Sequence, residues 1–357
     1  MKNPFTHTPG MVGDSNIVTK KEEIIYNNFL YDVPSESVYK ITGIRGSGKT
    51  VIFGNVIRHY KTEAMKKEGW LSYDLSSARN LIRTLLSYMS LEDEVKPLVM
   101  KDKSSLTVSV PFVSAGMEMK DNDIDEEVRL EQLLSVLIRS GKKILIGIDD
   151  IAKTKPVTEF CSVYAKLIRN TVSDLDNRPW PLYLICSGVY HNFHELGESK
   201  NLTFFKRSAE VKTEPFGLAS MAVKYENSLG IEEEKAIELA KLTNGFAYAY
   251  QVIGSAYFEN SGSSLDHILK LAKGELFSQC YEKIWSELPD GERGILRILS
   301  HGPKKRSEVI AEMNKGNNYQ VYSNNLKKMG LLKSSDEAYG RAEITLPFFG
   351  EFIDKYC

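Results

Sequence analysis

The first 216 residues alternate short apolar segments with longer stretches of helical periodicity. Apolar residues recur at helical spacing from residue 49 to a glycine stop at Gly69, and again in the stretch that follows the acidic residues near 125. The apolar segments have the length of buried strands and fall at 37–43, 70–75, 142–149, 182–188 and 209–216. Apolar strands separated by helices are typical of a parallel sheet covered on both faces. The pattern therefore predicts an α/β fold.

Residues 105–120 depart from this alternation. The segment SLTVSVPFVSAGMEMK alternates apolar and polar positions and contains Pro111 and Gly116. These features predict a hairpin at the edge of the sheet, inserted between two of its elements. An acidic stretch, 121–127, leads from it into the next helix.

The pattern changes again after Phe216. Residues 217–276 show helical periodicity without a strand candidate, which predicts a small helical subdomain. From about Gln279 onward, three helical patterns precede two short strands around a turn, and this is the order of a winged helix. We therefore predict an α/β domain at 1–216, a helical lid at 217–276 and a winged-helix domain at 277–357.

Composition and charge exclude several classes of protein. The 357 residues are 42% hydrophobic and 26% charged, as in ordinary globular proteins. Because 46 Lys plus Arg nearly balance 47 Asp plus Glu, binding to nucleic acid or an anionic membrane would need a local patch. The four cysteines form no CxxC pair, the N-terminus lacks the apolar run of a signal peptide, and no apolar run is long enough to cross a bilayer. We expect a cytoplasmic protein without structural zinc and without a membrane partner.

The segment GIRGSGKT, residues 43–50, carries the most specific chemistry. It matches the phosphate-binding pattern GxxxxGK[ST] at every fixed position, and it follows a predicted strand and opens a predicted helix. Glycines let the backbone curl with its N–H groups directed at an anion, Lys49 can reach the β and γ phosphates, and Thr50 can ligate Mg²⁺. The expected nucleotide-binding residues are Gly43, Arg45, Gly46, Ser47, Gly48, Lys49, Thr50 and Val51. No guanine-reading NKxD motif follows, which favours ATP.

Two adjacent carboxylates, Asp149 and Asp150, end the apolar strand KKILIGI. A metal-binding acid is expected at the end of a neighbouring strand, at the same edge of the sheet as the phosphate loop. We expect Asp149 to hold Mg²⁺ through water, together with Thr50, and Asp150 to polarise the attacking water. The alternative is that the pair caps the segment after the strand.

At this point the chain resembles the AAA+ ATPases, and within them the branch of archaeal-type, initiator-like and STAND ATPases. The resemblance is carried by GIRGSGKT, KKILIGIDD, LYLICSG, FFKRS, TNGFAYAYQVIG and the opening NPFTHTPG. It implies a P-loop sheet of AAA+ type with a helical lid. It also implies that Ser187 stands at the sensor 1 position near the γ-phosphate, and that Arg207 is an arginine finger acting on a neighbouring subunit in a nucleotide-dependent homo-oligomer. The alternatives are that Ser187 is an ordinary serine at the end of a strand, and that Arg207 and Lys206 form a solvated basic pair.

The chain departs from this family pattern in three places. Ala247 replaces the lid proline after Gly245 and Phe246, so the aromatic run 246–250 is interpreted as helix packing rather than as a base-stacking site. The N-terminal adenine-contact motif is reduced to VTKKEEI, around Val18. Asp150 stands where many AAA+ motors have Glu, which indicates slow hydrolysis suited to a switch.

The third helix of the predicted winged helix could read DNA. It would present Asn317, Tyr319, Gln320, Ser323, Asn324, Lys327 and Lys328, with a wing near 339–341. Residues 281–357 nevertheless hold 12 Lys plus Arg against 11 Asp plus Glu, far from the charge of a basic nucleic-acid domain. DNA binding and protein docking by this module therefore both stay open.

These features together predict a Mg²⁺-dependent ATPase of AAA+ type. Its nucleotide state would set the angle between the P-loop domain and the lid, and so position the winged helix. The alternatives are a DNA-binding regulator that holds ATP with little turnover, and a protein-interaction scaffold.

Overall fold

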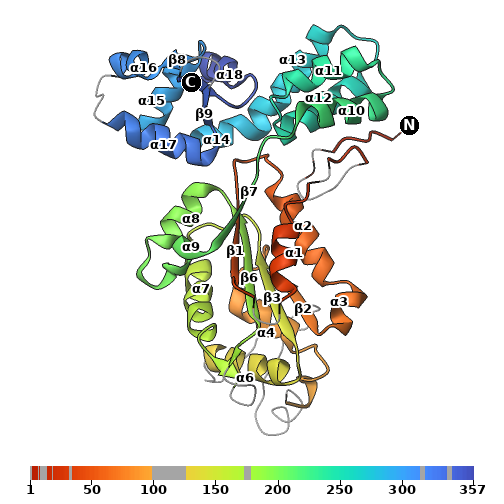
Figure 1. The fold of residues 1–357 in the computed structure, drawn as a ribbon, viewed down its shortest axis with the longest axis vertical. Helices are drawn as coiled ribbons and strands as arrows, with labels where there is room; N and C mark the ends of the chain where they lie inside the picture. The colour runs from red at the N-terminus through yellow and green to blue at the C-terminus, as the bar shows by residue number, and fades with distance from the viewer. Residues whose placement is uncertain are drawn as a thin grey trace, which may run out of the picture. The chain divides into compact units, whose positions relative to one another are not determined.

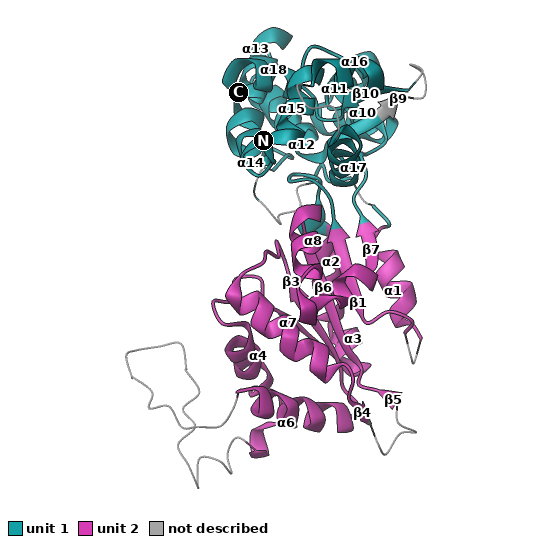
Figure 2. Cartoon of the chain, turned by 90° about the vertical axis from the view of Figure 1, so that its left-hand side faces the viewer, with its two compact units in different colours: residues 1–20, 42–51, 212–357 teal, residues 21–41, 52–211 magenta. Residues whose placement is uncertain are grey.

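The computed structural model describes residues 2–6, 8, 14–17, 19–31, 34–98, 126–172, 178–313, 318–335 and 340–357. The hairpin expected at 105–120 lies outside these residues. The chain divides into two compact units, which Figure 2 colours separately. Unit 1 comprises Met1–Lys20, Thr42–Val51 and Lys212–Cys357, and unit 2 comprises Lys21–Ile41 and Ile52–Val211.

A five-stranded sheet forms the centre of unit 2, and its last residues at Thr42 and Lys212 pass into unit 1. The strands lie in the order β2-β3-β6-β1-β7, and β3 pairs in parallel with both β2 and β6. Their bounds are β1 Val38–Thr42, β2 Trp70–Asp74, β3 Lys143–Ile148, β6 Leu182–Gly188 and β7 Ala209–Lys212. Each falls on a predicted apolar segment, so the α/β fold with a parallel sheet is confirmed.

Helices cover both faces of this sheet (Figure 1). Ile144, Ile146 and Ile148 of β3 pack with α4, α6 and α7, whereas Leu145 packs on the opposite face with α1 and α2. This alternation follows from the two-residue period of a strand and gives unit 2 two cores. The helices are α1 Glu23–Phe29, α2 Lys49–Tyr60, α3 Glu63–Lys67, α4 Leu81–Met89, α6 Glu126–Arg139, α7 Lys155–Leu167, α8 Tyr190–Gly197 and α9 Phe204–Arg207.

The helix expected from residue 49 to Gly69 is two helices, α2 and α3. Thr62 separates them with extended backbone and caps α3 by accepting a hydrogen bond from the N–H of Met65 at 3.4 Å. A threonine hydroxyl that bonds its own backbone favours such a break. Two short antiparallel strands, β4 Thr171–Val172 and β5 Arg178–Pro179, and a 3₁₀ turn, η1 Lys200–Leu202, complete unit 2.

Unit 1 contains the predicted helical lid. Its helices are α10 Leu218–Leu229, α11 Glu233–Leu242, α12 Ala247–Glu259 and α13 Leu265–Leu276. A π-helical turn, η2 Phe277–Tyr281, joins α13 to α14 Glu282–Ser286, so the predicted boundary at 276–277 falls within a continuous helical stretch. Gly230 ends α10 with φ of 63°, a left-handed cap that glycine adopts readily.

The C-terminal part of unit 1 has the element order of a winged helix. It contains the helices α15 Asp290–Leu299, α16 Arg306–Glu312 and α17 Tyr319–Met329 and a sheet of order β8-β10-β9, whose strand β8 lies between α15 and α16 and whose other two strands follow α17. Its strands are β8 Lys304–Lys305, β9 Leu332–Ser335 and β10 Arg341–Ile344, all antiparallel. A last helix, α18 Phe349–Tyr356, was not predicted and buries Phe349, Phe352 and Ile353 in the core that the lid and this module share.

Candidate nucleotide-binding site

The loop between β1 and α2 contains the three glycines of the phosphate-binding motif. Gly46 and Gly48 have φ of 81° and 91°, in the left-handed region that only glycine enters at little cost. A Cβ at Gly48 would meet no atom within 4 Å, so its requirement is conformational. The N–H of Ser47 donates to the Ile44 carbonyl at 3.2 Å, and the loop therefore closes a tight turn just before the helix.

Close packing adds a second reason for glycine at positions 43 and 46. A Cβ at Gly43 would lie 1.8 Å from Oγ1 of Thr213, and one at Gly46 would lie 2.8 Å from Cζ of Phe246. Thr213 Oγ1 is 2.7 Å from Oγ of Ser47, which donates to the Ile44 carbonyl at 2.7 Å. Sequence reasoning missed Thr213, and its position directly after β7 is the only signal that could have indicated it.

Lys49 begins α2 and is 8% exposed. Its Nζ donates to the Ile44 carbonyl at 2.8 Å, so the ammonium lies back over the loop. The first turn of α2 carries no acidic residue. Helix N–H groups, the positive end of the helix dipole and a lysine charge favour an anion at this end, as the motif predicts.

Beyond its first turn, α2 packs tightly on the sheet of unit 2. A Cβ at Gly147 in β3 would lie 2.6 Å from Cδ1 of Ile57 and 2.8 Å from Cζ of Phe53. The helix that starts at Lys49 is thus held against the strand that ends just before Asp149. The glycine of ILIGI allows this approach.

Asp149 and Asp150 follow β3 within a hydrogen-bonded network of unit 2. Ser187, at the end of β6 and 1% exposed, donates through Oγ to Oδ1 of Asp149 and accepts from the N–H of Asp150 at 3.3 Å. Its carbonyl accepts from the N–H of Ile151 at 2.8 Å. Asp150 has φ of 48° and is exposed, so the chain turns sharply here and presents the second carboxylate.

The network extends to Asp74 and Ser76 at the end of β2, and sequence reasoning did not consider these two residues as part of the site. Asp149 donates its N–H to Oγ of Ser76 at 2.8 Å, and Ser76 in turn donates to Oδ1 of Asp74. Asp74 is the last residue of β2, the strand next to β3. The signal in the sequence that could have indicated Asp74 was its position as a carboxylate at the end of a predicted strand.

The two halves of the predicted site belong to different units. The loop 43–50 is part of unit 1, whereas Asp149, Asp150, Ser187 and Arg207 are part of unit 2. Ser187 is brought together with both aspartates. Arg207 ends α9 and is exposed, while its neighbour Lys206 pairs with Glu198 at 2.9 Å. Assembly of both halves around one nucleotide remains a prediction.

Within unit 1, the lid holds the phosphate loop. The N–H of Tyr248 donates to the Gly46 carbonyl at 3.1 Å, and Arg45 pairs with Glu287 of the segment after α14 at 3.1 Å. Sγ of Cys280 lies 3.6 Å from the Arg45 carbonyl, and burial raises the pKa of this thiol to about 12. The loop is therefore fixed by three residues of the lid and of the helices that follow it.

The lid motif TNGF forms a sharp turn before α12. Asn244 and Gly245 have φ of 48° and 75°, and a Cβ at Gly245 would lie 2.6 Å from the Phe216 carbonyl. Phe246 is 5% exposed and packs in the lid core and against Gly46. Tyr250 is also buried in that core. Val18, the expected adenine contact, lies outside the residues that the structure describes.

In the winged-helix module, two of the residues that were predicted to contact DNA are buried. Tyr319 and Ser323 are 5% and 2% exposed, because they lie on the face of α17 that packs on the module's core, and so they cannot contact DNA. Gln320, Asn324, Lys327 and Lys328 are exposed as predicted. Asn317 and Tyr339 lie outside the described residues, and Arg341 is exposed.

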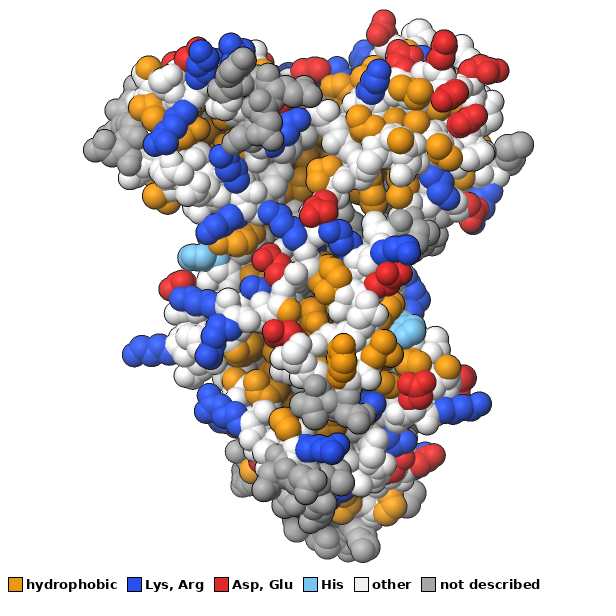
Figure 3. Space-filling model, in the orientation of Figure 1, with side chains coloured by type: hydrophobic (Ala, Val, Ile, Leu, Met, Phe, Trp, Pro, Cys, Tyr) orange, Lys and Arg blue, Asp and Glu red, His pale blue; other side chains and the backbone are white. Residues whose placement is uncertain are grey.

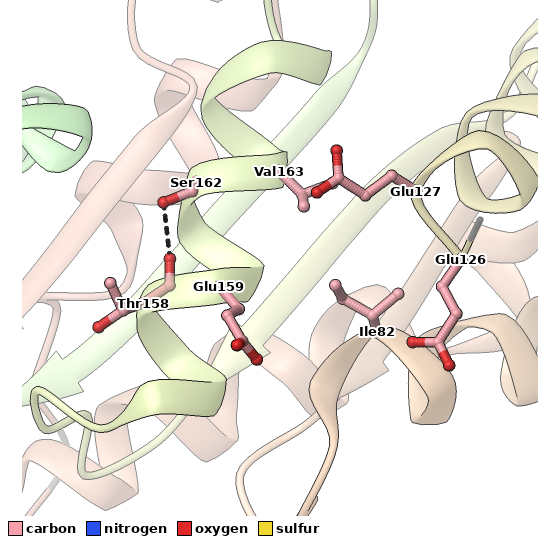
Figure 4. Close-up of a pocket in the computed structure, with 7 residues that line it drawn as sticks. All are labelled: Ile82, Glu126, Glu127, Thr158, Glu159, Ser162 and Val163. Atoms are coloured by element: carbon pink, nitrogen blue, oxygen red, sulfur yellow. Dashed lines mark hydrogen bonds between the residues drawn. The ribbon is translucent and has the colours of Figure 1, made fainter.

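A separate hollow lies among α4, α6 and α7 of unit 2 (Figure 4). Glu126, Glu127 and Glu159 line it together with Ile82 and Val163. Each glutamate has a basic partner: Arg83, Lys166 at 2.7 Å and Lys155 at 3.8 Å, respectively. This hollow contains none of the predicted site residues.

Within the described part of the chain, no helix is long and apolar enough to cross a membrane. The same residues contain no group of three His, Cys, Asp or Glu side chains that could hold a metal ion.

Solved structures share this fold. The Walker-type ATPase of Pyrococcus abyssi aligns over 95% of this chain and 96% of its own, at 16% identity and a TM-score of 0.59. The ORC2 protein of Aeropyrum pernix, solved with ADPNP and ADP, aligns over 93% and 91%, at 14% identity and a TM-score of 0.56. No family model and no curated protein matches the sequence.

The chain has the fold of a P-loop ATPase of AAA+ type. These similarities are too distant to show more than the fold. A STAND protein of Pyrococcus horikoshii, with a TM-score of 0.40, adds no argument to them. The predicted sheet, lid and C-terminal module are all part of the shared fold.

Proposed function

We propose that the protein binds ATP with Mg²⁺ in the loop 43–50 and hydrolyses it slowly, as a switch between two arrangements of its units. The observation that carries this proposal is the loop itself. Gly46 and Gly48 adopt backbone conformations suited to an anion cradle, at the N-terminus of a helix that begins with a buried lysine. The fold shared with a Walker-type ATPase and with a nucleotide-bound ORC2 protein supports it.

The residues fit the chemistry of a nucleotide and its metal. Lys49 would move from the Ile44 carbonyl to the β and γ phosphates, which offer it full negative charges. The hydroxyl of Thr50 and the carboxylate of Asp149 are oxygen ligands of the kind that Mg²⁺ prefers. A bound Mg²⁺ would neutralise charge on the phosphate oxygens. Asp150 would orient the attacking water, and Ser187 would keep Asp149 and the Asp150 backbone in position.

The distribution of the site over both units supports a switch. The loop 42–51 belongs with the lid and the winged helix, whereas the aspartates belong with the sheet. A γ-phosphate contacted from both sides would favour one arrangement of the units, and hydrolysis would release it. The action of Arg207 on a neighbouring subunit stays a further part of this proposal.

ATP affinity of the Lys49→Ala variant tests the proposal. We expect binding, measured by isothermal titration calorimetry with Mg²⁺, to weaken at least tenfold, because a charge-assisted contact to phosphate contributes about 1.5–3 kcal/mol. Lys143→Ala is the matched control. This half-buried lysine begins β3, outside the loop, and its Nζ lies over the ring of Trp70 in β2. Unchanged affinity of Lys49→Ala would refute nucleotide binding at this loop.

A second candidate function is DNA binding by the winged helix. The exposed cations of this module include Lys305 just before α16, Arg306 at its start and Lys327 on α17. The acids nearby are engaged: Glu308 accepts the N–H of Lys305 at 2.6 Å, and Glu312 pairs with Lys304 at 2.6 Å. Among the charged side chains on the visible face of this module, Figure 3 shows more Lys and Arg than Asp and Glu. These exposed cations favour an anionic partner, and duplex DNA is the candidate that we propose.

An electrophoretic mobility assay with duplex DNA, with and without ATP, tests this second function. Sizing the Asp150→Asn protein with ATP in parallel reports the number of subunits in the loaded state. A mobility shift supports DNA binding. No shift, together with a co-purifying protein, favours the scaffold alternative.

A further inference from the structure

The N-terminal segment Asn3-Pro4-Phe5 is docked on lid helix α12. Phe5 is 5% exposed, and its ring lies 5.8 Å from that of Tyr225 and 5.6 Å, edge-on, from that of Tyr250. A segment near the start of the chain thus supplies a core side chain to a subdomain more than 200 residues away in sequence.

Gly254 provides the space for this ring. A Cβ at Gly254 would lie 2.4, 2.5 and 2.6 Å from three ring atoms of Phe5, far inside van der Waals contact. Gly254 lies in the middle of α12, where glycine costs about 1 kcal/mol relative to alanine. The cost is offset by the close approach of the aromatic ring.

Polar contacts fix the register of the segment along α12. Asn3 Nδ2 donates to Oγ of Ser255 at 2.9 Å and to Oε1 of Glu259 at 2.8 Å. The N–H of Thr6 donates to Oε1 of Gln251 at 3.0 Å. These partners lie along the helix on either side of Gly254 and hold the segment in this register.

The chain returns to the same helix at Ser15. This fully buried serine donates its N–H and its Oγ to the Pro4 carbonyl at 3.2 and 2.9 Å. Its own carbonyl accepts from the hydroxyl of Tyr250 at 2.9 Å. The segment is thus attached to α12 at both of its ends.

The same helix holds the phosphate loop at its N-terminal end. Tyr248 in its first turn donates to the Gly46 carbonyl at 3.1 Å, and Phe246, just before it, packs against Gly46. A helix of 13 residues is about 20 Å long and rigid. The contacts of the N-terminal segment with the middle and the C-terminal half of α12 therefore also influence where the first turn of this helix lies beside Gly46.

We propose that Asn3, Phe5 and their receptor Gly254 are positioning residues for nucleotide binding. They hold α12 in the placement that keeps the Gly46 carbonyl and the loop in their binding conformation, without touching the nucleotide. This proposal rests on the proposed ATP binding at 43–50. Release of the segment lets α12 shift, and the nucleotide must then bear the free energy of ordering the loop.

Three variants test the proposal by ATP calorimetry and by hydrogen exchange of residues 43–50 in the nucleotide-free protein. Phe5→Ala empties the space beside Gly254, the notch, and Gly254→Ala fills this notch from the helix side. Asn3→Ala removes three hydrogen bonds, two to α12 and one from the N–H of Phe5, while leaving the core side chains in place. We expect Phe5→Ala and Gly254→Ala to weaken ATP binding roughly fivefold or more, with faster exchange in the loop. Asn3→Ala should weaken binding roughly twofold, and it remains informative if the other two fail to fold.

Leu239→Ala is the matched control, because this fully buried residue lies in the same lid core but belongs to α11 and not to α12 or the segment. It should lower thermal stability without changing ATP affinity. A loss of affinity in the control as large as in Phe5→Ala would reduce the effect to general weakening of the lid and overturn the proposal.

The double variant Phe5→Ala/Gly254→Ala tests whether the two single substitutions act through the same contact. The added methyl enters space that the ring has left, so the two affinity losses should be clearly less than additive. Full additivity would contradict a shared notch. Wild-type affinity in all three variants, with binding lost in Lys49→Ala, would refute the positioning role alone. Wild-type affinity in Lys49→Ala would refute the proposed function itself.

Discussion

At the scale of single residues, Ser187 connects the parts of the predicted hydrolytic half-site. It is buried at the end of β6, donates to the carboxylate of Asp149 and accepts from the backbone of Asp150. A serine that only ended a strand would not need either contact. The position indicated by family resemblance therefore has a definite structural role beside both aspartates.

Ser187→Ala should lower the ATP hydrolysis rate at saturating Mg²⁺-ATP by about 10- to 100-fold, as loss of a residue that orients a metal ligand commonly does. ATP affinity without Mg²⁺ should stay unchanged, because the loop 43–50 is untouched. Steady-state phosphate release measures the first quantity, and calorimetry in EDTA the second. Ser162→Ala on α7 is the control. A wild-type rate would show that Asp149 is positioned without Ser187.

The thiols offer a second test at this scale. Burial raises the pKa of Cys161 and Cys280 to about 12 and raises that of Cys186 well above its usual value, whereas Cys357 is exposed. A raised pKa keeps a thiol protonated and unreactive at about pH 8, since only the thiolate attacks. We expect one of the four cysteines to react rapidly with Ellman's reagent in the native protein and all four in denaturant. Rapid reaction of two or more native thiols would contradict the burial.

At the scale of elements, the part of α2 that belongs to unit 2 packs closely on β3. Phe53 and Ile57 occupy the space that a side chain at Gly147 would need. The strand ILIGI reads simply as apolar in the sequence. Its single glycine lies where side chains of the phosphate-loop helix leave no room for a Cβ.

Gly147→Ala should destabilise the protein by about 1–3 kcal/mol, the usual cost of overpacking a core. Urea unfolding followed by circular dichroism measures the change. Gly274→Ala is the control, because this exposed glycine within α13 meets nothing within 4 Å and alanine there should stabilise by up to about 1 kcal/mol. Equal stability of the two variants would argue against close packing at Gly147.

At the scale of the whole molecule, charge sets the terms of any DNA binding. With 46 basic and 47 acidic residues, the protein has no overall attraction for nucleic acid. We propose that any binding comes from the exposed cations of the winged helix, where a small number of phosphate contacts would give a shallow dependence on salt.

We expect Lys305→Ala/Lys327→Ala to reduce the slope of log K against log salt by about 2, because each lysine would otherwise neutralise one phosphate. Fluorescence anisotropy with labelled duplex between about 50 and 200 mM salt measures the slope. Lys235→Ala/Lys241→Ala on α11 of the lid is the charge-matched control. If both double variants keep the wild-type slope, DNA does not bind through the winged helix.

Much of the fold and of the loop was predictable from sequence, because both depend on local patterns. The five strands follow from apolar runs, and the phosphate loop follows from glycines, lysine and threonine at fixed spacing. The break at Thr62 and the helix α18 were missed, since a cap and a terminal helix compete with nearby patterns of similar strength. The burial of Tyr319 and Ser323 was missed because helical phase depends on the core against which the helix packs.

The sequence by itself determined the turn of the candidate phosphate loop, since left-handed backbone at Gly46 and Gly48 needs no distant partner. Only the tertiary structure decided what holds that loop. Thr213, Phe246 and Tyr248 reach it from segments more than 160 residues away, and Phe5 reaches α12 from the other end of the chain. Such contacts leave no local periodicity, because they depend on which surfaces the folded chain brings together.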